Sequence, residues 1–281
     1  MRNMPFMPEL SMNEVTTFRW SLDEDVANYR QAGYRSIGIW RHKLADWDEE
    51  RAVDLVVGNG LCVSNVSSAG GFTGVGGLTF REGIEDAAGA LRLAAAMQAG
   101  CLVLYPGARN NHTLRHAFRL LRLALDELLP LAEDCEVPLA LEPMHAACAS
   151  GATFLTDFDA VWELLEDYRS PLLKLAYDTY HFPWELADRN VLGEIARHLG
   201  IVYLGDRRRP PSIDQERCPL GRGELPLAEI VAALVDAGYM GPFDVRLLVA
   251  DGRPCDYWTL LEQSKQAFEQ MAQAATSRTV A

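Results

Sequence analysis

Residues 138–145 read PLALEPMH and residues 172–181 read LLKLAYDTYH. Each stretch is a short apolar run that stops at a carboxylate, Glu142 or Asp178, with a histidine three residues further on. A helical pattern separates the two runs, which is the order of parallel strands joined by a crossover helix. Polar groups that follow parallel strands collect at the carboxyl-terminal rim of the sheet, where α/β proteins place their chemistry. We therefore expect the functional site at this rim.

The same alternation extends along the chain, and no composition break or Ser/Gly-rich linker divides it. The expected strands are residues 16–20, 35–40, 61–66, 101–105, 138–141, 172–177, 201–204 and 243–248. The expected helices with clear ends are residues 21–32, 48–59, 81–98, 113–135, 190–198, 225–237 and 256–275. Eight such units predict the α/β class and a single (β/α)8 TIM barrel over residues 14–276. Residues 1–13 are expected to form a loosely ordered arm, and residues 277–281 a tail. A doubly wound open sheet is the alternative, disfavoured because no G-x-G-x-x-G follows the first strand.

Composition excludes several classes of protein. The chain has 281 residues, of which 49% are hydrophobic and 23% charged, so it can bury a full core. Its net charge of −13 argues against a nucleic-acid partner. The six cysteines are scattered without a CxxC pair, which favours reduced thiols over disulfides or a zinc knuckle. No apolar run reaches the roughly 18 residues that span a membrane, and residues 1–12 lack a secretory pattern. A cytoplasmic location without membrane contact is expected.

The two carboxylates are expected to lie side by side on neighbouring strands. Without a cation between them they would repel, and one would hold a proton, so a divalent ion or an arginine should be close. A salt bridge to an arginine is the alternative to a role for Glu142 as metal ligand or general base. His145 and His181 would add imidazole ligands to the carboxylates, a set that suits Mn²⁺, Mg²⁺, Co²⁺ or Zn²⁺. The alternative for both is an ordinary loop histidine.

The segment after the seventh strand, residues 207–220, is rich in arginine. It is expected to lie over the same rim, where arginine forks would suit a phosphate or carboxylate on a substrate. A solvated surface run is the alternative. The glycine-rich residues 69–77 favour a flexible lid over a phosphate cradle, because no P-loop lysine follows them. No organic cofactor is expected.

Several motifs in this order resemble one superfamily. They are Leu141-Glu142-Pro143, Asp178-Thr179-Tyr180-His181, Asp206, Gly221-Arg222-Gly223, the AGYMGP of residues 237–242, the WSLDED of residues 20–25 and the GIWR of residues 38–41. Together they resemble the xylose isomerase-like TIM-barrel superfamily over almost the whole chain. That superfamily includes sugar and sugar-phosphate isomerases and epimerases, keto-inositol dehydratases and related lyases. The resemblance implies a small sugar or polyol substrate and is compatible with a homodimer.

In that superfamily a divalent metal is held by a glutamate after strand five, an aspartate after strand six, a histidine on strand seven and a glutamate on strand eight. The resemblance carries the first two ligands to Glu142 and Asp178. Tyr203 and Arg246 stand at the other two positions, with Asp244 as an alternative ligand. Because half of the ligand set is replaced, metal binding is expected to be weak or absent. The guanidinium of Arg246 could instead pair with Glu142 or Asp178 and neutralise them.

The resemblance implies a sugar or keto-sugar isomerase or epimerase that abstracts a proton next to a carbonyl. The residues expected in catalysis are Glu142, His145, His181 and Arg246. Those expected to bind substrate are Trp40, Asp206, Arg208 and Arg217. A lyase or dehydratase acting on a keto-sugar or inositol derivative, and a non-catalytic polyol-binding barrel, remain as alternatives. An endonuclease IV-like DNA-repair enzyme is discounted because the chain is acidic and lacks the multi-histidine metal set.

Overall fold

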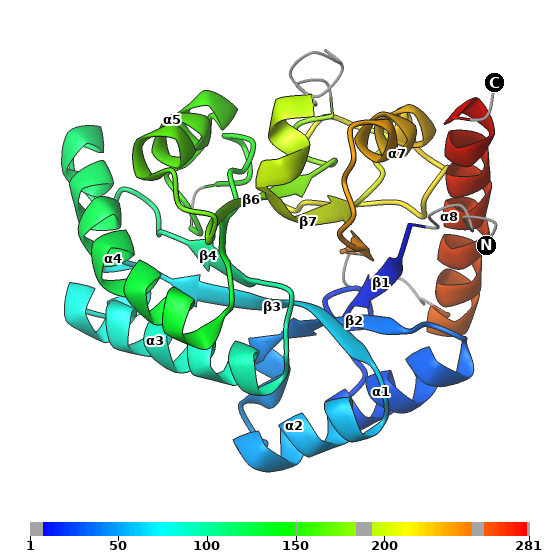
Figure 1. The fold of residues 1–281 in the computed structure, drawn as a ribbon, viewed down its shortest axis with the longest axis horizontal. Helices are drawn as coiled ribbons and strands as arrows, with labels where there is room; N and C mark the ends of the chain where they lie inside the picture. The colour runs from blue at the N-terminus through cyan, green and yellow to red at the C-terminus, as the bar shows by residue number, and fades with distance from the viewer. Residues whose placement is uncertain (1–7, 150, 184–192, 249–255, 280–281) are drawn as a thin grey trace, which may run out of the picture.

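Eight parallel strands form a closed barrel in which each strand pairs with the next and β8 pairs with β1. The computed structural model describes residues 8–149, 151–183, 193–248 and 256–279. Helices surround the barrel on its outside (Figure 1). The prediction of a single (β/α)8 TIM barrel is therefore confirmed, and the open sheet is excluded.

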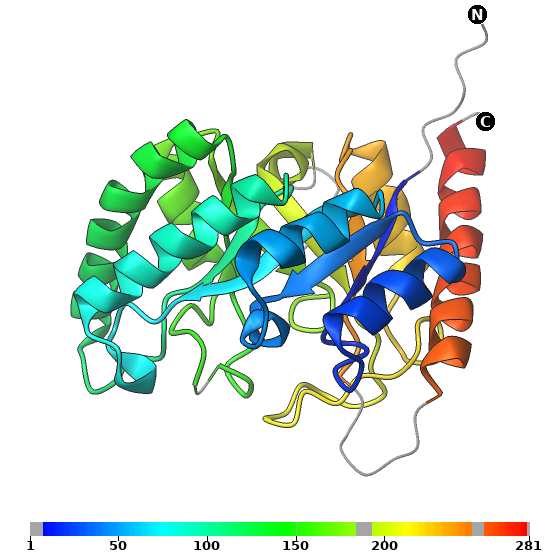
Figure 2. The ribbon, with the colours of Figure 1, turned by 90° about the horizontal axis from the view of Figure 1, so that it is seen from below.

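The strands are short and buried, as the apolar runs predicted. They are β1 (Leu10–Asn13), β2 (Ser36–Trp40), β3 (Cys62–Gly70), β4 (Leu102–Tyr105), β5 (Leu139–Leu141), β6 (Leu173–Asp178), β7 (Leu199–Leu204) and β8 (Phe243–Val245). All of them run in the same direction, so their carboxyl ends meet at one rim. Figure 2 shows the loops that follow the strands, green and yellow, extending from one side of the barrel.

Helices α1 to α5 each begin after a polar capping residue, whereas Pro226 precedes α7. The described helices are α1 (Leu22–Gln31), α2 (Glu49–Gly58), α3 (Phe80–Ala96), α4 (Leu114–Cys135), α5 (Phe158–Tyr168), α7 (Leu227–Asp236) and α8 (Tyr257–Thr279). At the start of α1, the backbone N–H of Ser21 donates to Glu24 Oε2 over 2.9 Å, as part of a capping box. Of the helix expected at 190–198, residues 190–192 lie outside the described part, and Ala196–His198 forms a 3₁₀ turn.

The prediction for the first strand was wrong. Thr16–Trp20 is a run of turns, and β1 is formed instead by Leu10–Asn13, which pairs with β2 and β8. The hydroxyl of Thr16 donates to the carbonyl of Val245 over 2.9 Å, so this β-favouring residue ties a loop to the barrel. Tertiary contacts therefore override local strand propensity here.

Several further boundaries differ from the prediction. Strand β3 ends at Gly70 rather than at residue 66, and β7 begins at Leu199 rather than at residue 201. Residues 10–13, expected in the loose arm, belong to the barrel, and residues 277–279, expected in the tail, continue α8. Strand β8 stops at Val245 rather than at residue 248. Residues 1–7 and 280–281 lie outside the described part of the chain. Within that part, no helix combines the length and apolar character of a membrane span.

The inside of the barrel has an apolar part and a polar part. The apolar cluster consists of Cys101, Val103, Ala140, Ala176, Ile201 and Tyr203. The polar part consists of Ser11, Asn13, Ser64, Asn65 and Asp244, all buried. The phenol of Tyr203 joins the two by donating to Asn65 Oδ1 over 2.8 Å, from β7 across to β3. Buried polar groups are thus paired with one another below the rim.

Candidate active site

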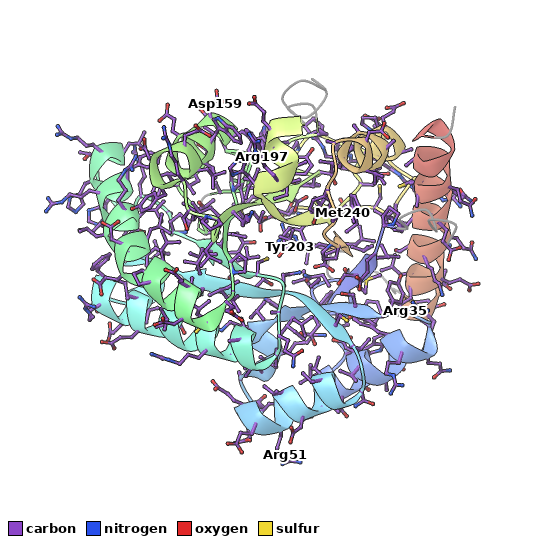
Figure 3. All side chains as sticks on the ribbon, in the orientation of Figure 1. Arg35, Arg51, Asp159, Arg197, Tyr203 and Met240 are labelled. Carbon is purple, nitrogen blue, oxygen red and sulfur yellow. The ribbon has the colours of Figure 1, made fainter. Side chains whose placement is uncertain are left out.

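Three charged side chains from three strands meet at the carboxyl-terminal rim. Glu142 follows β5 directly, Asp178 is the last residue of β6, and Arg246 follows β8 directly. All three are buried, with exposed fractions of 0%, 1% and 6%. Asp178 is in register with Tyr203 of β7, which in turn pairs with Asp244 of β8. Tyr203 lies near the centre of the barrel in Figure 3.

The guanidinium of Arg246 bridges the two carboxylates. Its Nη1 donates to Glu142 Oε2 over 3.0 Å, and its Nη2 contacts both Glu142 Oε1 and Asp178 Oδ2. The phenol of Tyr105 donates to Glu142 Oε2 over 2.7 Å and accepts from Arg246 Nη1 over 3.1 Å. Arg246 therefore occupies the position of the cation that two adjacent carboxylates require.

A second guanidinium neutralises Asp178. Arg217, 5% exposed, forms a fork in which Nη1 donates to Oδ1 over 3.0 Å and Nη2 to Oδ2 over 2.9 Å. The backbone N–H of Tyr180 also donates to Asp178 Oδ1, over 2.8 Å. Burial alone would raise the pKa of Asp178, but Arg217 and Arg246 together hold that pKa well below its ordinary value. Asp178 is therefore an ionised anchor for two arginines.

The ring of Tyr203 forms a platform for Arg246. The guanidinium carbon lies 3.7 Å from the ring centroid, within the range of a cation–π contact. Burial raises the pKa of Tyr203, so its hydroxyl stays protonated and can donate to Asn65. Asn65 Nδ2 donates to Asp244 Oδ2 over 2.7 Å, as does Asn13 Nδ2. A hydrogen-bonded chain thus connects the platform to three other strands.

The two histidines differ in environment. His181 is 2% exposed, and neither of its ring nitrogens has a partner among the residues that the structure describes. Burial lowers the pKa of His181 to about 3, with Arg217 and Arg246 adding to the shift and Asp178 opposing it, so the ring is neutral. His145 is half-buried, and its Nδ1 accepts the backbone N–H of Ala147 over 3.2 Å. Its Nε2 is then the nitrogen left for a ligand.

The residues expected to bind substrate are spread over the same rim. Arg217 belongs to the charged cluster. Asp206 is fully buried and accepts three backbone N–H groups of its own loop, so its contacts are structural. Arg208 is exposed and donates to the carbonyl of Arg222 over 3.0 Å. Trp40 is half-buried and stacks on His42, with ring centroids 5.2 Å apart.

Two contributors to the site were missed in the sequence. Tyr105 is the last residue of strand β4, at the same rim as Glu142. Its place at the end of a predicted strand could have marked it as a site residue. Asn65 is a polar residue in the buried part of strand β3, and such a residue usually has a buried partner. Its partner, Tyr203, is 138 positions away in the chain, and only closure of the barrel brings the two together.

A divalent ion is the group that the superfamily pattern implies here. Glu142, Asp178 and His181 present ligand atoms within 4.8 Å of one another, a spacing that could hold a metal ion. Both carboxylates, however, already bind Arg246. Two unit charges about 4 Å apart repel by ~4 kcal/mol at an effective dielectric constant of about 20, and a divalent ion doubles this. With Arg246 in this position, the residues do not fit a resident divalent ion.

The family described as "Xylose isomerase-like TIM barrel" matches residues 26–272, and the chain belongs to it. Over 131 residues the chain is 30% identical to a D-psicose 3-epimerase of Enterocloster bolteae. That match covers 46% of this chain but only 39% of the epimerase.

Solved structures resemble the whole barrel. A protein of Sinorhizobium meliloti 1021 is 25% identical, with a TM-score of 0.81 over 92% of this chain and 98% of its own. An L-ribulose 3-epimerase is 19% identical, with a TM-score of 0.78 over 98% and 97% of the two chains. At that identity the second likeness concerns the fold alone.

Proposed function

We propose that the chain is a sugar or keto-sugar isomerase or epimerase-like enzyme that abstracts a proton next to a carbonyl without a bound metal. The family and its epimerase relative support the reaction class. The observation that carries the proposal is the Arg246 guanidinium held between Glu142 and Asp178. It supplies a fixed positive charge at the point where an enediolate oxygen would develop negative charge.

Glu142 is the proposed base. An ionised carboxylate has about four acceptor sites, and Glu142 uses three of them, for Tyr105 and for the two terminal nitrogens of Arg246. The remaining site on Oε1 can take the proton from the substrate carbon. The electrons of the broken C–H bond then form a C=C bond, and the carbonyl oxygen becomes the enediolate oxygen. Asp178 already accepts four hydrogen bonds and is the anchor rather than the base.

Return of the proton decides between isomerisation and epimerisation. A guanidinium cannot act as a base near neutral pH. Arg246 therefore cannot exchange a proton with the substrate as a second carboxylate on the opposite face would. Once the proton of the neighbouring hydroxyl has passed to the enediolate oxygen, Glu142 can return its own proton to the former carbonyl carbon on the same face, which is aldose–ketose isomerisation. Inversion at one carbon would need a donor on the other face, and Nε2 of His145 is the candidate.

Elimination is the second candidate reaction. In such a dehydration of a keto-sugar or inositol derivative, Glu142 would take the proton next to the carbonyl and Arg246 would stabilise the enolate oxygen. Protonated Glu142 would then give its proton to the departing hydroxyl, which leaves as water. The same single-base arrangement therefore supports a lyase. Product analysis separates the candidates, because isomerisation conserves the mass of the sugar and dehydration lowers it by one water.

The test is hydrogen exchange at a substrate carbon in heavy water. The purified chain is incubated with a panel of ketoses, aldoses and sugar acids, with and without Mn²⁺. Exchange is expected to be independent of Mn²⁺ and to fall by about 10²–10⁴-fold in Glu142→Gln. The matched control is Glu163→Gln, which makes the same change on the exposed side of α5.

Elemental analysis of protein purified without chelator completes the test. The proposal expects no stoichiometric metal. One tightly held ion per chain, or exchange that requires Mn²⁺, would contradict the metal-free mechanism. Absence of exchange with every substrate of the panel would contradict the enzyme assignment and favour a polyol-binding barrel.

A further inference from the structure

The polar atoms left without a partner in the site are mainly hydrogen-bond donors. Among the described residues, the buried unpartnered atoms near the rim are both ring nitrogens of His181, Nε of Arg246 and Nε of Arg207. A guanidinium can only donate, and a neutral imidazole donates through one nitrogen and accepts through the other. The carboxylates offer almost nothing in return, because Asp178 has no acceptor site left and Glu142 has one.

The other buried unpartnered atoms of the described residues lie on the β1–β2 side of the rim, inside the barrel and on helix α8. They are on Glu14, Asp244 and Ser264. Glu14 follows β1, and its other carboxylate oxygen accepts the backbone N–H of Trp40. Asp244 lies two residues before Arg246, among its amide partners inside the barrel, and Ser264 is on α8. The donor excess is therefore specific to the side of the rim formed after β5–β8.

The charges of the rim lead to the same conclusion. The two carboxylates are balanced by Arg217 and Arg246, so this cluster is neutral without a ligand. Arg207 adds one further positive charge, 5.8 Å from the Tyr180 ring centroid, and Arg217 lies 4.5 Å from the same centroid. Within the described residues, no carboxylate lies at ion-pair distance from Arg207.

The acidic side chains near Arg207 leave its guanidinium available to bind a ligand. Asp206 and Glu224 act on it electrostatically. Asp206, however, is bound to three backbone N–H groups, and Glu224 is exposed to water. The only hydrogen bond of the Arg207 guanidinium in the described part of the chain is a 3.4 Å bond from Nη1 to the carbonyl of Arg209.

The loop that carries Arg207 is fixed over the rim. Cys148 Sγ, after β5, donates to the carbonyl of Ser212 over 3.1 Å. The N–H of Ser212 donates to the phenol of Tyr180, after β6, over 3.4 Å. The Tyr180 ring packs edge-on against His181, with centroids 5.1 Å apart. Arg207 and the unpartnered imidazole therefore belong to one surface built from the β5, β6 and β7 loops.

From this surface we infer that the substrate carries an oxyanion, either the carboxylate of a sugar acid or the phosphate of a sugar phosphate. The oxyanion is bound by Arg207 at the Tyr180 side of the rim. The reacting carbons lie toward Glu142, with His181 and Arg246 Nε meeting substrate oxygens. A neutral polyol offers hydroxyl groups that need acceptors, which this site has already used. The inference rests on the proposed function and narrows its substrate class.

Binding measurements on the full chain test it. The probes for calorimetric titration are D-gluconate, D-glucitol 6-phosphate, neutral D-glucitol and inorganic phosphate. One of the two anionic sugars is expected to bind at least about tenfold more tightly than D-glucitol, with affinity falling as NaCl is added because the contact is ionic. Which one binds distinguishes carboxylate from phosphate.

Variants locate the contact. Arg207→Gln is expected to weaken binding of the anionic sugar about tenfold and to leave binding of D-glucitol unchanged. Arg51→Gln is the matched control, because Arg51 is exposed on the outer side of α2 and the change in net charge is the same (Figure 3). It is expected to bind all probes like the wild type.

Three results would overturn the inference. They are equal affinity for D-glucitol and the anionic sugars, an equal loss for every probe in Arg207→Gln, and inorganic phosphate binding as tightly as the sugar phosphate. The outcome is separable from that of the proposed function. Anionic sugars that bind without exchanging hydrogen would contradict the chemistry alone, and neutral sugars that exchange while anions do not bind would contradict this inference alone.

Discussion

Arg246 reaches both carboxylates because it directly follows β8, opposite the ends of β5 and β6. The sequence predicted that this guanidinium pairs with Glu142 or Asp178, and the structure has both ion pairs. The ion pair between Arg217 and Asp178 could not be predicted from the sequence. Arg217 lies in a loop, and a position in a loop does not determine where a long side chain points. The catalytic and binding roles assigned to these residues remain predictions.

Replacing Arg246 tests whether its charge stands in for an ion. Arg246→Glu adds a third carboxylate to the group that already contains His181, so this variant is expected to bind one Mn²⁺ per chain in a calorimetric titration. Without metal it is expected to lose about 3–5 kcal/mol of stability, because buried carboxylates lose their counter-charge.

Arg246→Met is the companion variant, since it removes the charge without adding a ligand. Its melting temperature should fall at neutral pH and recover partly with Mn²⁺, while the wild type should not respond to Mn²⁺. Equal stabilisation of the wild type and both variants by Mn²⁺ would show that the guanidinium does not displace an ion.

At the level of elements, β2 approaches the centre of the barrel closely because Gly38 has no side chain. A Cβ at this position would lie 2.3 Å from Asp244 Oδ2, 2.5 Å from Asn13 Nδ2 and 2.9 Å from Asn65 Nδ2. Gly38→Ala is therefore expected to destabilise the fold by about 1–3 kcal/mol through overpacking. It should also disturb the support of Tyr203 and lower activity, because Asn65 accepts the hydrogen bond of the Tyr203 hydroxyl.

The matched control is Gly89→Ala in α3, where a Cβ meets nothing within 4 Å. This substitution should stabilise the chain by roughly 0.5–1 kcal/mol, because alanine is a better helix residue than glycine. Urea unfolding of both variants measures the two changes. If Gly38→Ala were as harmless as Gly89→Ala, the polar residues inside the barrel would not be tightly packed.

Elements with strong periodicity could be predicted from the sequence, and those defined by long-range pairing could not. The runs at β5 and β6 are apolar and end sharply, so their strands were placed correctly to within a residue or two. Strand β1 contains only Leu10 and Met12 as apolar residues, and nothing local distinguishes it from a loop. It is a strand because β2 and β8 pair with it when the barrel closes.

On the scale of the whole molecule, eight-fold alternation predicted the barrel, because short parallel strands with intervening helices have few ways to bury both faces of a sheet. The rim site followed from the same topology. The polar interior of the barrel could not be predicted in this way, because Asn13, Asn65 and Asp244 come from three strands that are far apart in the sequence. These interior groups also determine how the whole fold responds to pH.

Burial raises the pKa of Asp244 from 3.8 to about 6, although Asn13 and Asn65 oppose the shift. Burial likewise raises the pKa of Asp25 from 3.8 to about 6, with Lys43 opposing. Between about pH 4 and 6 the folded chain therefore binds more protons at these groups than the unfolded chain. Their contribution to stability is complete below about pH 4 and is lost as the pH rises through 6.

His181 acts in the opposite direction over part of this range. Its folded pKa of about 3 lies below the ordinary value, so the unfolded chain binds the extra proton between about pH 3 and 6.5. Burial also raises the pKa of Glu14 and lowers the pKa of His198. Three carboxyl groups with a raised pKa outweigh two imidazoles with a lowered pKa, so the free energy of unfolding is expected to fall overall from about pH 5 to 7.

Asp244→Asn isolates one of these contributions. An amide cannot ionise. In this variant the free energy of unfolding should therefore fall less steeply between pH 4 and 6, by up to about 1.4 kcal/mol per pH unit. The measurement is urea unfolding at a series of pH values, with Asp159→Asn as the control because Asp159 is exposed on α5 (Figure 3). An unchanged slope in Asp244→Asn would mean that this carboxyl group ionises as readily in the folded barrel as in the unfolded chain. The donors from Asn13 and Asn65 and the charge of Arg246 would then compensate fully for its burial.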